Sequence, residues 1–444
     1  MDISIFQLLN PWRTGRQWDI PHIERTVTKK IEAWIDEPEI LILSGARQVG
    51  KTSILYQLIA RLLSSKLAKP EDIYYFNLDL AGISEFLEDQ ASFLRFIEIE
   101  KRKKTYVLID EVQRLADPGL FIKGLHDLRL PVKFILTGSS SLDIRTKTQE
   151  ALTGRKQVFN ISALSFSEFL NTLPGLHNQP ALDPDNYHLY LGQLNEALRM
   201  YSFYGGYPVL GSTEDHEKKM MRLNEIFTSY LEKDIAGFLR VENIPLFRKL
   251  VALLAAQQGG LVNIQELSLT LSANRETVSR YIHYLEETFV INLLTPFFSN
   301  PRTELSKMPK IYFKDPGLRN LARGGGMTQR NLMVTEDLGK VLEGIVATCV
   351  SSEFPSSMKL NYWRSKAGAE VDFILSDGKP IASIEVKAGG LKEIRVSRGY
   401  RSFLLKYKPE KSILLNDMLW AEKEISGCVV EAIPTAIFLL QHHV

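Results

Sequence analysis

One stretch near the N-terminus combines glycines, a lysine and a hydroxyl at a spacing that holds phosphate. It fits the pattern G-x-x-x-x-G-K-[ST], and it lies between the apolar run 40–43 and the apolar-periodic residues 54–59. Glycines permit backbone angles at which several N–H groups converge on a phosphate, and the helix start behind them adds partial positive charge. We therefore expect nine consecutive residues to bind a nucleotide: Gly45, Ala46, Arg47, Gln48, Val49, Gly50, Lys51, Thr52 and Ser53.

Two side chains of this stretch have distinct expected roles in ATP binding. Two acidic residues further along the chain complete the predicted site. Lys51 is expected to reach the β- and γ-phosphates of ATP, and the hydroxyl of Thr52 to bind Mg²⁺. The apolar run 106–109 ends in Asp110 and Glu111. A buried strand that delivers an aspartate beside the phosphate loop holds the water shell of the ion, and the next glutamate orients and deprotonates the attacking water. The pattern predicts ATP hydrolysis.

Further polar residues follow the next two strands. The apolar run 132–136 ends in a polar tip, where Thr137 and Ser139 are candidate catalytic sensors of the γ-phosphate or the attacking water. The alternative is a turn with ordinary serine content. Arg155 precedes the short strand 158–161, and in that place it would face the nucleotide of a neighbouring subunit. A surface or intrachain salt bridge is the alternative for Arg155.

A second group of acidic residues lies near the C-terminus. Glu385 and Lys387 share one face of the strand 382–387, because side chains alternate along a strand. Asp372 on the neighbouring strand joins them, and Glu343 from the helix 338–350 completes the shell. Carboxylates suit Mg²⁺ or Mn²⁺, and a lysine can position or activate a water. Exposed acids on an ordinary strand pair, or an intact fold without catalysis, are the alternatives.

Residues 245–296 predict three helices, the last two joined by a short turn, and 290–294 follows as a wing strand. The last helix has an apolar face and a polar face, formed by Val278, Ile282 and Leu285 and by Arg275, Arg280 and His283 respectively. Such a module can place its last helix in the major groove of DNA. Winged helices also pack against protein, so both interpretations stay open.

Composition limits the partners and the compartment. The chain has 444 residues, 45% of them hydrophobic and 24% charged, with a net charge of +2. Any contact with nucleic acid must therefore come from local patches. The two cysteines lack metal-ligand spacing and fit a reducing compartment. No apolar run approaches the length of about 20 residues that spans a bilayer, and no signal-peptide pattern is present, so we expect a cytoplasmic protein without a membrane partner.

The elements that must position these residues alternate between strand and helix through residues 39–164. This alternation predicts an α/β core with a right-handed, mostly parallel sheet covered on both faces. The sequences GARQVGKTS, YVLIDEVQ, FILTGSSS and LTGR, with Tyr204-Gly-Gly-Tyr-Pro208, together resemble the prokaryotic AAA+ ATPases that carry a C-terminal nuclease-like domain. The resemblance spans nearly the whole chain. It implies a homo-oligomeric ATPase with the sheet order 5-1-4-3-2.

The acidic C-terminal pattern is similar to the PD-(D/E)XK nuclease fold, although Val371 stands where that pattern has proline. The expected domains are an N-terminal arm (1–38), a P-loop core of AAA+/ASCE type (39–164), a helical lid (165–244), a winged-helix-like module (245–330) and a nuclease-like α/β domain (331–444). We expect Mg²⁺-dependent ATP binding and hydrolysis coupled to work on DNA, with metal-dependent DNA cleavage, using Mg²⁺ or Mn²⁺, as an extension. The alternative is a nucleotide-dependent switch or scaffold that binds a partner without cutting.

Overall fold

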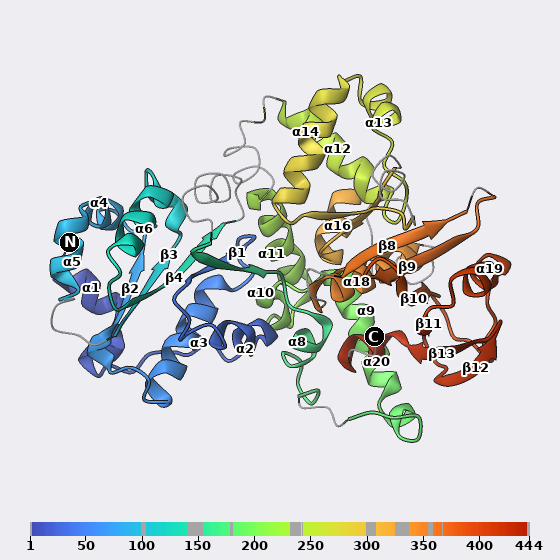
Figure 1. Cartoon of the computed structure of the whole chain (residues 1–444), viewed down its shortest axis with the longest axis horizontal. Helices are drawn as coiled ribbons and strands as arrows, with labels where there is room; N and C mark the ends of the chain where they lie inside the picture. Colours follow the sequence, from blue (N-terminus) through green and yellow to red (C-terminus); the bar gives the residue numbers. More distant parts are fainter. Residues whose placement is uncertain are drawn as a thin grey trace. The chain divides into compact units, whose positions relative to one another are not determined.

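A computed structural model describes residues 2–98, 104–139, 154–177, 181–230, 241, 243–298, 308–324, 337–353, 358–365 and 367–441 (Figure 1). The chain divides into two compact units, which are described separately. The first, called the N-terminal unit, is Met1–Leu164 with Ser229–Arg240 and Glu287–Phe289. The second, called the C-terminal unit, is Ser165–Thr228 with Val241–Glu286 and Val290–Val444.

The N-terminal unit is built on a parallel five-stranded sheet of order β2-β3-β4-β1-β5. This order confirms the one that the resemblance implies. Strands β1 and β3 are buried along their whole length, which explains why both read as continuous apolar runs. The strands are β1 (Ile40–Gly45), β2 (Ile73–Asn77), β3 (Thr105–Asp110), β4 (Val132–Ser139) and β5 (Lys156–Ile161).

Single residues mark where two helices of this unit begin. The apolar-periodic stretch 83–98 forms two helices, because Asp89 ends the first and caps the second by accepting the N–H of Ser92 at 3.1 Å. The helix of the N-terminal arm that precedes β1 begins at Thr26, since Arg25 is extended. The helices are α1 (Ile3–Leu9), α2 (Thr26–Glu32), α3 (Lys51–Ser64), α4 (Ile83–Glu88), α5 (Gln90–Phe96) and α6 (Pro118–Asp127).

The N-terminal arm packs along β2, the edge strand of the sheet. Asn10, which follows α1, makes two hydrogen bonds with the backbone of Tyr75: its amide donates to the carbonyl at 2.9 Å, and its oxygen accepts the N–H at 2.7 Å. The indole of Trp12 donates to the carbonyl of Ile73 at 3.5 Å. An open strand edge invites pairing with another chain, and the arm covers part of this one.

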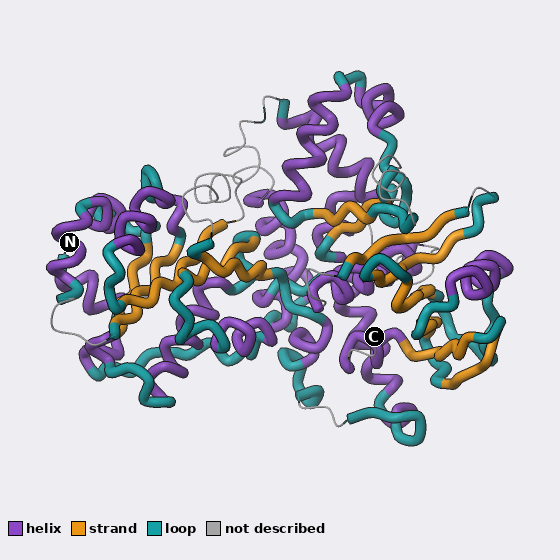
Figure 2. The backbone as a smooth tube through the Cα atoms, in the orientation of Figure 1, coloured by secondary structure: helices purple, strands orange, loops and turns teal. Residues whose placement is uncertain are grey.

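In the C-terminal unit, helices surround a two-stranded and a six-stranded sheet (Figure 2). Three helices and a strand follow each other as the sequence predicts: α12 (Ile244–Ala256), α13 (Ile264–Leu271), α14 (Arg275–Glu287) and β6 (Ile291–Leu294). Strand β7 (Lys310–Phe313) pairs with β6 in antiparallel fashion. The other helices are α8 (Phe166–Leu170), α9 (Leu191–Tyr204), α10 (Pro208–Gly211), α11 (His216–Thr228), α16 (Pro316–Arg323), α18 (Asp337–Glu353), α19 (Arg398–Tyr407) and α20 (Thr435–Gln441). None of the helices in the described ranges is long and apolar enough to cross a membrane.

The six-stranded sheet has the order β12-β13-β11-β10-β9-β8. Strand β8 pairs with β9 and β9 with β10 in antiparallel fashion, so Asp372 lies on the strand next to that of Glu385, as predicted. The strands are β8 (Lys359–Arg364), β9 (Glu370–Ser376), β10 (Pro380–Val386), β11 (Lys411–Asn416), β12 (Ala421–Ile425) and β13 (Cys428–Pro434). Residues 165–228, predicted as a lid, belong to this unit, where α9 packs against α16, α18 and α20. Their closure over a nucleotide stays a prediction.

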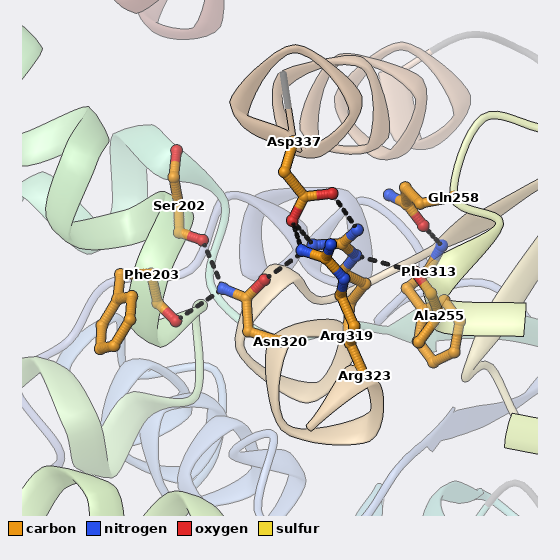
Figure 3. A network of polar contacts seen from close by, with 9 residues as sticks. All are labelled: Ser202, Phe203, Ala255, Gln258, Phe313, Arg319, Asn320, Arg323 and Asp337. Carbon is orange, nitrogen blue, oxygen red and sulfur yellow. Dashed lines mark hydrogen bonds and ion pairs between the residues drawn. The ribbon is translucent and has the colours of Figure 1, made fainter. Parts of the chain in front are cut away.

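A buried ionic network joins α16 to α18 (Figure 3). Arg319 is fully buried, and its guanidinium binds both carboxylate oxygens of Asp337 at 2.6 and 2.7 Å. Its Nε donates to the carbonyl of Ala255 at 3.0 Å, and Arg323 contacts the same aspartate. Burial acts to raise the pKa of Asp337, but the two guanidinium groups outweigh it and leave that pKa below its usual value.

The Tyr204-Gly-Gly-Tyr-Pro208 sequence docks on the start of α16. Asp315, the N-cap of α16, accepts the N–H of Gly206 at 2.8 Å and that of Leu318 at 2.9 Å. Gly205 has φ of 82°, and a Cβ there would collide with the carboxylate of Asp315. The first glycine of the motif is therefore required both by its backbone angle and by this close approach.

Candidate functional site

The phosphate-binding stretch forms the loop between β1 and α3. Gly50 caps α3 with φ of 94°, and a Cβ on Gly45 would collide with the carbonyl of Ile161. The ammonium group of Lys51, 5% exposed, donates to the carbonyls of Gly45 and Ala46 at 3.0 and 2.9 Å. The ammonium group of Lys51 is therefore bound by carbonyls of the loop itself. Phosphate oxygens of a bound nucleotide would replace these two carbonyls as its acceptors.

Asp110 lies at the end of β3, beside this loop, and is 1% exposed. Its Oδ2 accepts the hydroxyls of Thr52 at 2.7 Å and Tyr75 at 3.0 Å, and its Oδ1 accepts that of Thr137. A carboxylate offers about four acceptor positions, so one position on Oδ1 remains for a further donor such as a metal-bound water. Because Thr52 donates its proton to Asp110, its oxygen lone pairs are left to bind a cation. The predicted pairing of Thr52 and Asp110 is thus present.

Glu111 is the residue after β3 and has a left-handed backbone with φ of 60°. A non-glycine residue keeps this conformation only where its surroundings hold it. Its N–H donates to the hydroxyl of Thr137 at 3.1 Å, and its carboxylate accepts the side-chain amide of Gln113. Thr137 therefore links the two acidic residues, and its contact with a γ-phosphate stays a prediction.

The other sensor and the proposed trans arginine are placed by their backbones. Ser139 lies opposite Gly45 in the pairing of β4 with β1, and Ser140 and Ser141 lie outside the described residues. Arg155 lies just before β5. The first residue of β5 pairs with Ile40, the first residue of β1, so Arg155 is at the amino-terminal end of the strands, whereas the phosphate loop follows their carboxyl-terminal end. Its guanidinium is 3.3 Å from Asp127 at the end of α6. The intrachain salt bridge is present, and the contact across a subunit interface stays a prediction.

The C-terminal unit brings the second predicted group together from α18, β9 and β10. Lys387 and Glu385 form an ion pair at 2.7 Å, as their same-face placement predicts. Asp372 accepts the N–H of Val386 at 2.9 Å, which places it beside the end of β10. Glu343 accepts the hydroxyl of Tyr312 at 3.2 Å.

Strand β7 adds two residues that the sequence did not single out for this site. Tyr312 reaches Glu343, and Lys310, with its side chain 3% exposed, forms an ion pair with Glu370 of β9. Alternation along a strand places residues two apart on one face, so β7 presents both groups to the same cluster. The signal was a lysine and a tyrosine at this spacing in a strand that otherwise reads as core.

Negative charge exceeds positive charge in this carboxylate cluster. The four carboxylates Glu343, Glu370, Asp372 and Glu385 face the three cations Lys310, Arg364 and Lys387, an excess of one negative charge when all are ionised. Burial first, and then mutual repulsion, raise the pKa of Glu343 and Glu385, and burial raises that of Asp372.

The carboxylates are of the chemical type that binds a divalent cation, but their oxygens do not converge on one position. Glu385 is 6% exposed, and its Oε2 has no hydrogen-bond partner. Buried polar atoms without a partner are rare, and they point to a missing ion or water. Among the residues that the structure describes, no three acidic, histidine or cysteine side chains converge as a metal site. The oxygens instead accept bonds from Tyr312, Val386 and Lys387.

Helix α14 confirms the predicted division into two faces. Val278, Ile282 and Leu285 are buried. The opposite face lines a hollow of about 650 Å³ with Arg275 and Arg280, together with Ile264, Glu276, Ser279 and His283. Arg275, Arg280 and His283 are exposed on this face of α14.

Residues 37–170 match a family model described as an AAA domain. This match covers the loop, β3 and β4, and with the parallel sheet it fits a P-loop ATPase core. Residues 195–329 and 338–437 match two families described as domains of unknown function, DUF8612 and DUF4143. The winged-helix and nuclease-like identities thus remain resemblances.

Relatives occur in bacteria and archaea. An uncharacterised protein of Mycobacterium tuberculosis is 26% identical over 385 residues, covering 86% of this chain and 77% of that one. An uncharacterised protein of Methanocaldococcus jannaschii is 25% identical over 441 residues, covering 92% and 87%. Among solved structures, the Walker-type ATPase of Pyrococcus abyssi is similar with 15% identity and a TM-score of 0.42, covering 70% of this chain and 98% of that one. The ORC1 protein of Aeropyrum pernix in complex with DNA has 15% identity and a TM-score of 0.31, covering 68% and 93%.

Proposed function

We propose that this chain binds ATP and hydrolyses it with Mg²⁺ at the loop between β1 and α3. The observation that carries the proposal is the hydrogen bond from Thr52 to Asp110 at 2.7 Å, with Lys51 in the loop and Glu111 next in sequence. The match of residues 37–170 to the AAA domain supports it. These groups are the ones that phosphoryl transfer to water requires.

The residues divide the work between binding and proton transfer. Lys51 would exchange its carbonyl partners for β- and γ-phosphate oxygens, while the N–H groups of the loop hold the phosphates in place. Bound Mg²⁺ supplies neutralisation of the charge that develops on those oxygens. Asp110 would orient one of the waters around the ion through Oδ1. Glu111 would release the amide of Gln113 and take the proton of the attacking water.

The test is ATP turnover by purified full-length protein. Lys51→Ala should abolish tight nucleotide binding or turnover, because the phosphates lose their mobile cation. Lys123→Ala, on the exposed side of α6, is the matched control and should keep the parental rate. Equal turnover in the two variants would contradict the assignment of Lys51.

We further propose that the protein acts on DNA as a homo-oligomer. The support is the exposed face of α14, where Arg275, Arg280 and His283 lie together on a helix that follows a short turn after α13. The resemblance to AAA+ ATPases supports assembly of several copies. Turnover measured with and without duplex, single-stranded and branched DNA tests this, and DNA stimulation lost in Arg275→Ala/Arg280→Ala is expected.

Metal-dependent cleavage of DNA is a second candidate function, with the carboxylate cluster as its site. The unpartnered oxygen of Glu385 and the excess negative charge support binding of Mg²⁺ or Mn²⁺. Glu343, Asp372 and Glu385 would hold the ion, and Lys387 would position the attacking water. Asp372→Ala should remove both cation binding and any cleavage while ATP binding persists. Cleavage that survives in Asp372→Ala would come from another source.

A nucleotide-dependent switch or scaffold is the alternative to both DNA activities. In that case ATP turnover is indifferent to DNA, no DNA substrate is cut, and a protein partner binds with an affinity that depends on the nucleotide. The same assays separate these functions, because DNA stimulation and cleavage are measured on one preparation.

A further inference from the structure

Tyr75, in the middle of β2, reaches the candidate magnesium residue Asp110 from the strand that pairs with β3. It is 1% exposed, and its hydroxyl donates to Oδ2 of Asp110 at 3.0 Å. The same oxygen accepts the hydroxyl of Thr52. Burial, and then the negative charge of Asp110, raise the pKa of Tyr75, so its hydroxyl stays protonated and remains a donor.

The surroundings of Tyr75 hold it in this position. Asn10 of the N-terminal arm binds both the N–H and the carbonyl of Tyr75. The ring of Tyr56 lies 5.2 Å from the ring of Tyr75, and Tyr56 follows Thr52 by one helical turn on α3. Trp18 of the arm packs on Tyr56 with ring centroids 5.8 Å apart. Backbone and ring are thus both fixed before any ligand binds.

We propose that Tyr75 is a positioning residue for the metal-binding function of Asp110. This inference rests on the proposed nucleotide site. Two hydroxyls on Oδ2 and one on Oδ1 leave Asp110 a single free acceptor position, on Oδ1, and the two donors on Oδ2 together fix the angle of the carboxylate and with it the direction of that position. Without the hydroxyl of Tyr75, the carboxylate can rotate toward Thr52, and its free Oδ1 position no longer aims at the water shell of the ion.

Tyr75→Phe removes the hydroxyl and keeps the ring. The test measures the dissociation constant of a non-hydrolysable ATP analogue in excess EDTA and in saturating Mg²⁺. The constant in EDTA divided by the constant in Mg²⁺ gives the gain in affinity that Mg²⁺ provides. A hydrogen bond to a charged group contributes enough that its loss should lower this ratio roughly three- to tenfold, since Thr52 and Thr137 still hold Asp110. Binding in EDTA should stay at the wild-type value.

Tyr74→Phe is the matched control. Tyr74 is the neighbour of Tyr75 on β2, points to the other face of the sheet, and donates its hydroxyl to the carbonyl of Ile97 at 3.2 Å. This variant also loses one buried hydroxyl, but it should leave both constants unchanged. If Tyr75→Phe does not fold, Tyr56→Leu carries the test, because it removes the ring that packs on Tyr75 and should lower the ratio about twofold.

Two results would overturn the inference. One is a ratio equal to that of the wild type in a folded Tyr75→Phe chain. The other is an equal weakening of binding in EDTA and in Mg²⁺, which would show a role in the loop rather than at the cation. A wild-type chain that binds the analogue with Mg²⁺ dependence but hydrolyses no ATP would refute the proposed hydrolysis and leave this inference intact. A wild-type chain that binds no nucleotide would refute both.

Discussion

Asp315 is a buried carboxylate whose ionisation should make the stability of the C-terminal unit depend on pH. It caps α16 and accepts backbone N–H groups of Gly206 and Leu318. Burial raises its pKa from 3.8 to about 6, although these hydrogen bonds act in the opposite direction. The Tyr204-Gly-Gly-Tyr-Pro208 sequence is thus hydrogen-bonded to a carboxyl group whose ionised form is disfavoured by burial.

The sign and size of the effect follow from this shift. A carboxyl group with a raised pKa binds its proton more tightly in the folded chain, so its stabilising contribution is complete below pH 3.8 and is lost as the pH rises through about 6. A shift of this size corresponds to about 3 kcal/mol, of which about 2 kcal/mol falls between pH 4.5 and 7.5. The expected direction is therefore a gain in stability on acidification from this group.

Asp315→Asn isolates the effect, because asparagine keeps the size and the capping oxygen but does not titrate. Urea unfolding of both chains, followed by tryptophan fluorescence at several pH values, gives the free energy of unfolding of each. The other titrating groups are common to both chains and cancel in the difference. Wild type minus variant should rise by about 2 kcal/mol from pH 7.5 to 4.5. A difference that is flat over this range, or that falls, would refute the reasoning.

Three further predictions concern the two candidate sites. Glu111→Gln should retain ATP and stop hydrolysis, since it removes the base and leaves the metal residue in place, and turnover at the parental rate would show that another group activates the water. Mixing the inactive Lys51→Ala and Arg155→Ala chains should restore part of the ATPase activity if the arginine acts across an interface, whereas no recovery in verified mixed oligomers assigns it to its intrachain salt bridge. Lys310→Met should bind Mn²⁺ at least about threefold more tightly in calorimetry, because the most buried of the three competing cations is gone; the exposed Lys379→Met is its control, and an unchanged affinity would place Lys310 outside the cluster's electrostatics.

The residues whose positions the sequence could predict are those set by local chain geometry. Lys51, Thr52, Asp110 and Glu111 follow the ends of apolar runs, and parallel strands buried on both faces leave such runs uninterrupted. Each residue lies at the end of its strand, and the carboxyl ends of parallel strands meet at the same end of the sheet. Both placements can be predicted without knowledge of the rest of the fold. The strand order came from the resemblance and could not be read from these runs.

Residues that act through contacts distant in sequence could not be found in the same way. Tyr75 reads as ordinary strand content, because a tyrosine in a strand usually reports packing rather than a hydroxyl bound to an acid. Lys310 and Tyr312 share a face by alternation, but the sequence does not say which strand that face meets. Arg319 could not be placed for a related reason. A charged residue in a sequence predicts an exposed side chain, but here the ion pair with Asp337, eighteen residues away, offsets the cost of burying the guanidinium.

The pair of Arg319 and Asp337 also sets the rotational phase of α18. Asp337 is the first residue of that helix, and Glu343 of the carboxylate cluster follows it on the same helix. Each residue advances an α-helix by about 100° around its axis and about 1.5 Å along it. A slip of α18 by a single residue would turn Glu343 out of the cluster, so two hydrogen bonds at the helix start fix the angle at which the carboxylate arrives. Substitution of Arg319 would therefore change the direction in which the side chain of Glu343 points, even where α18 itself stays helical.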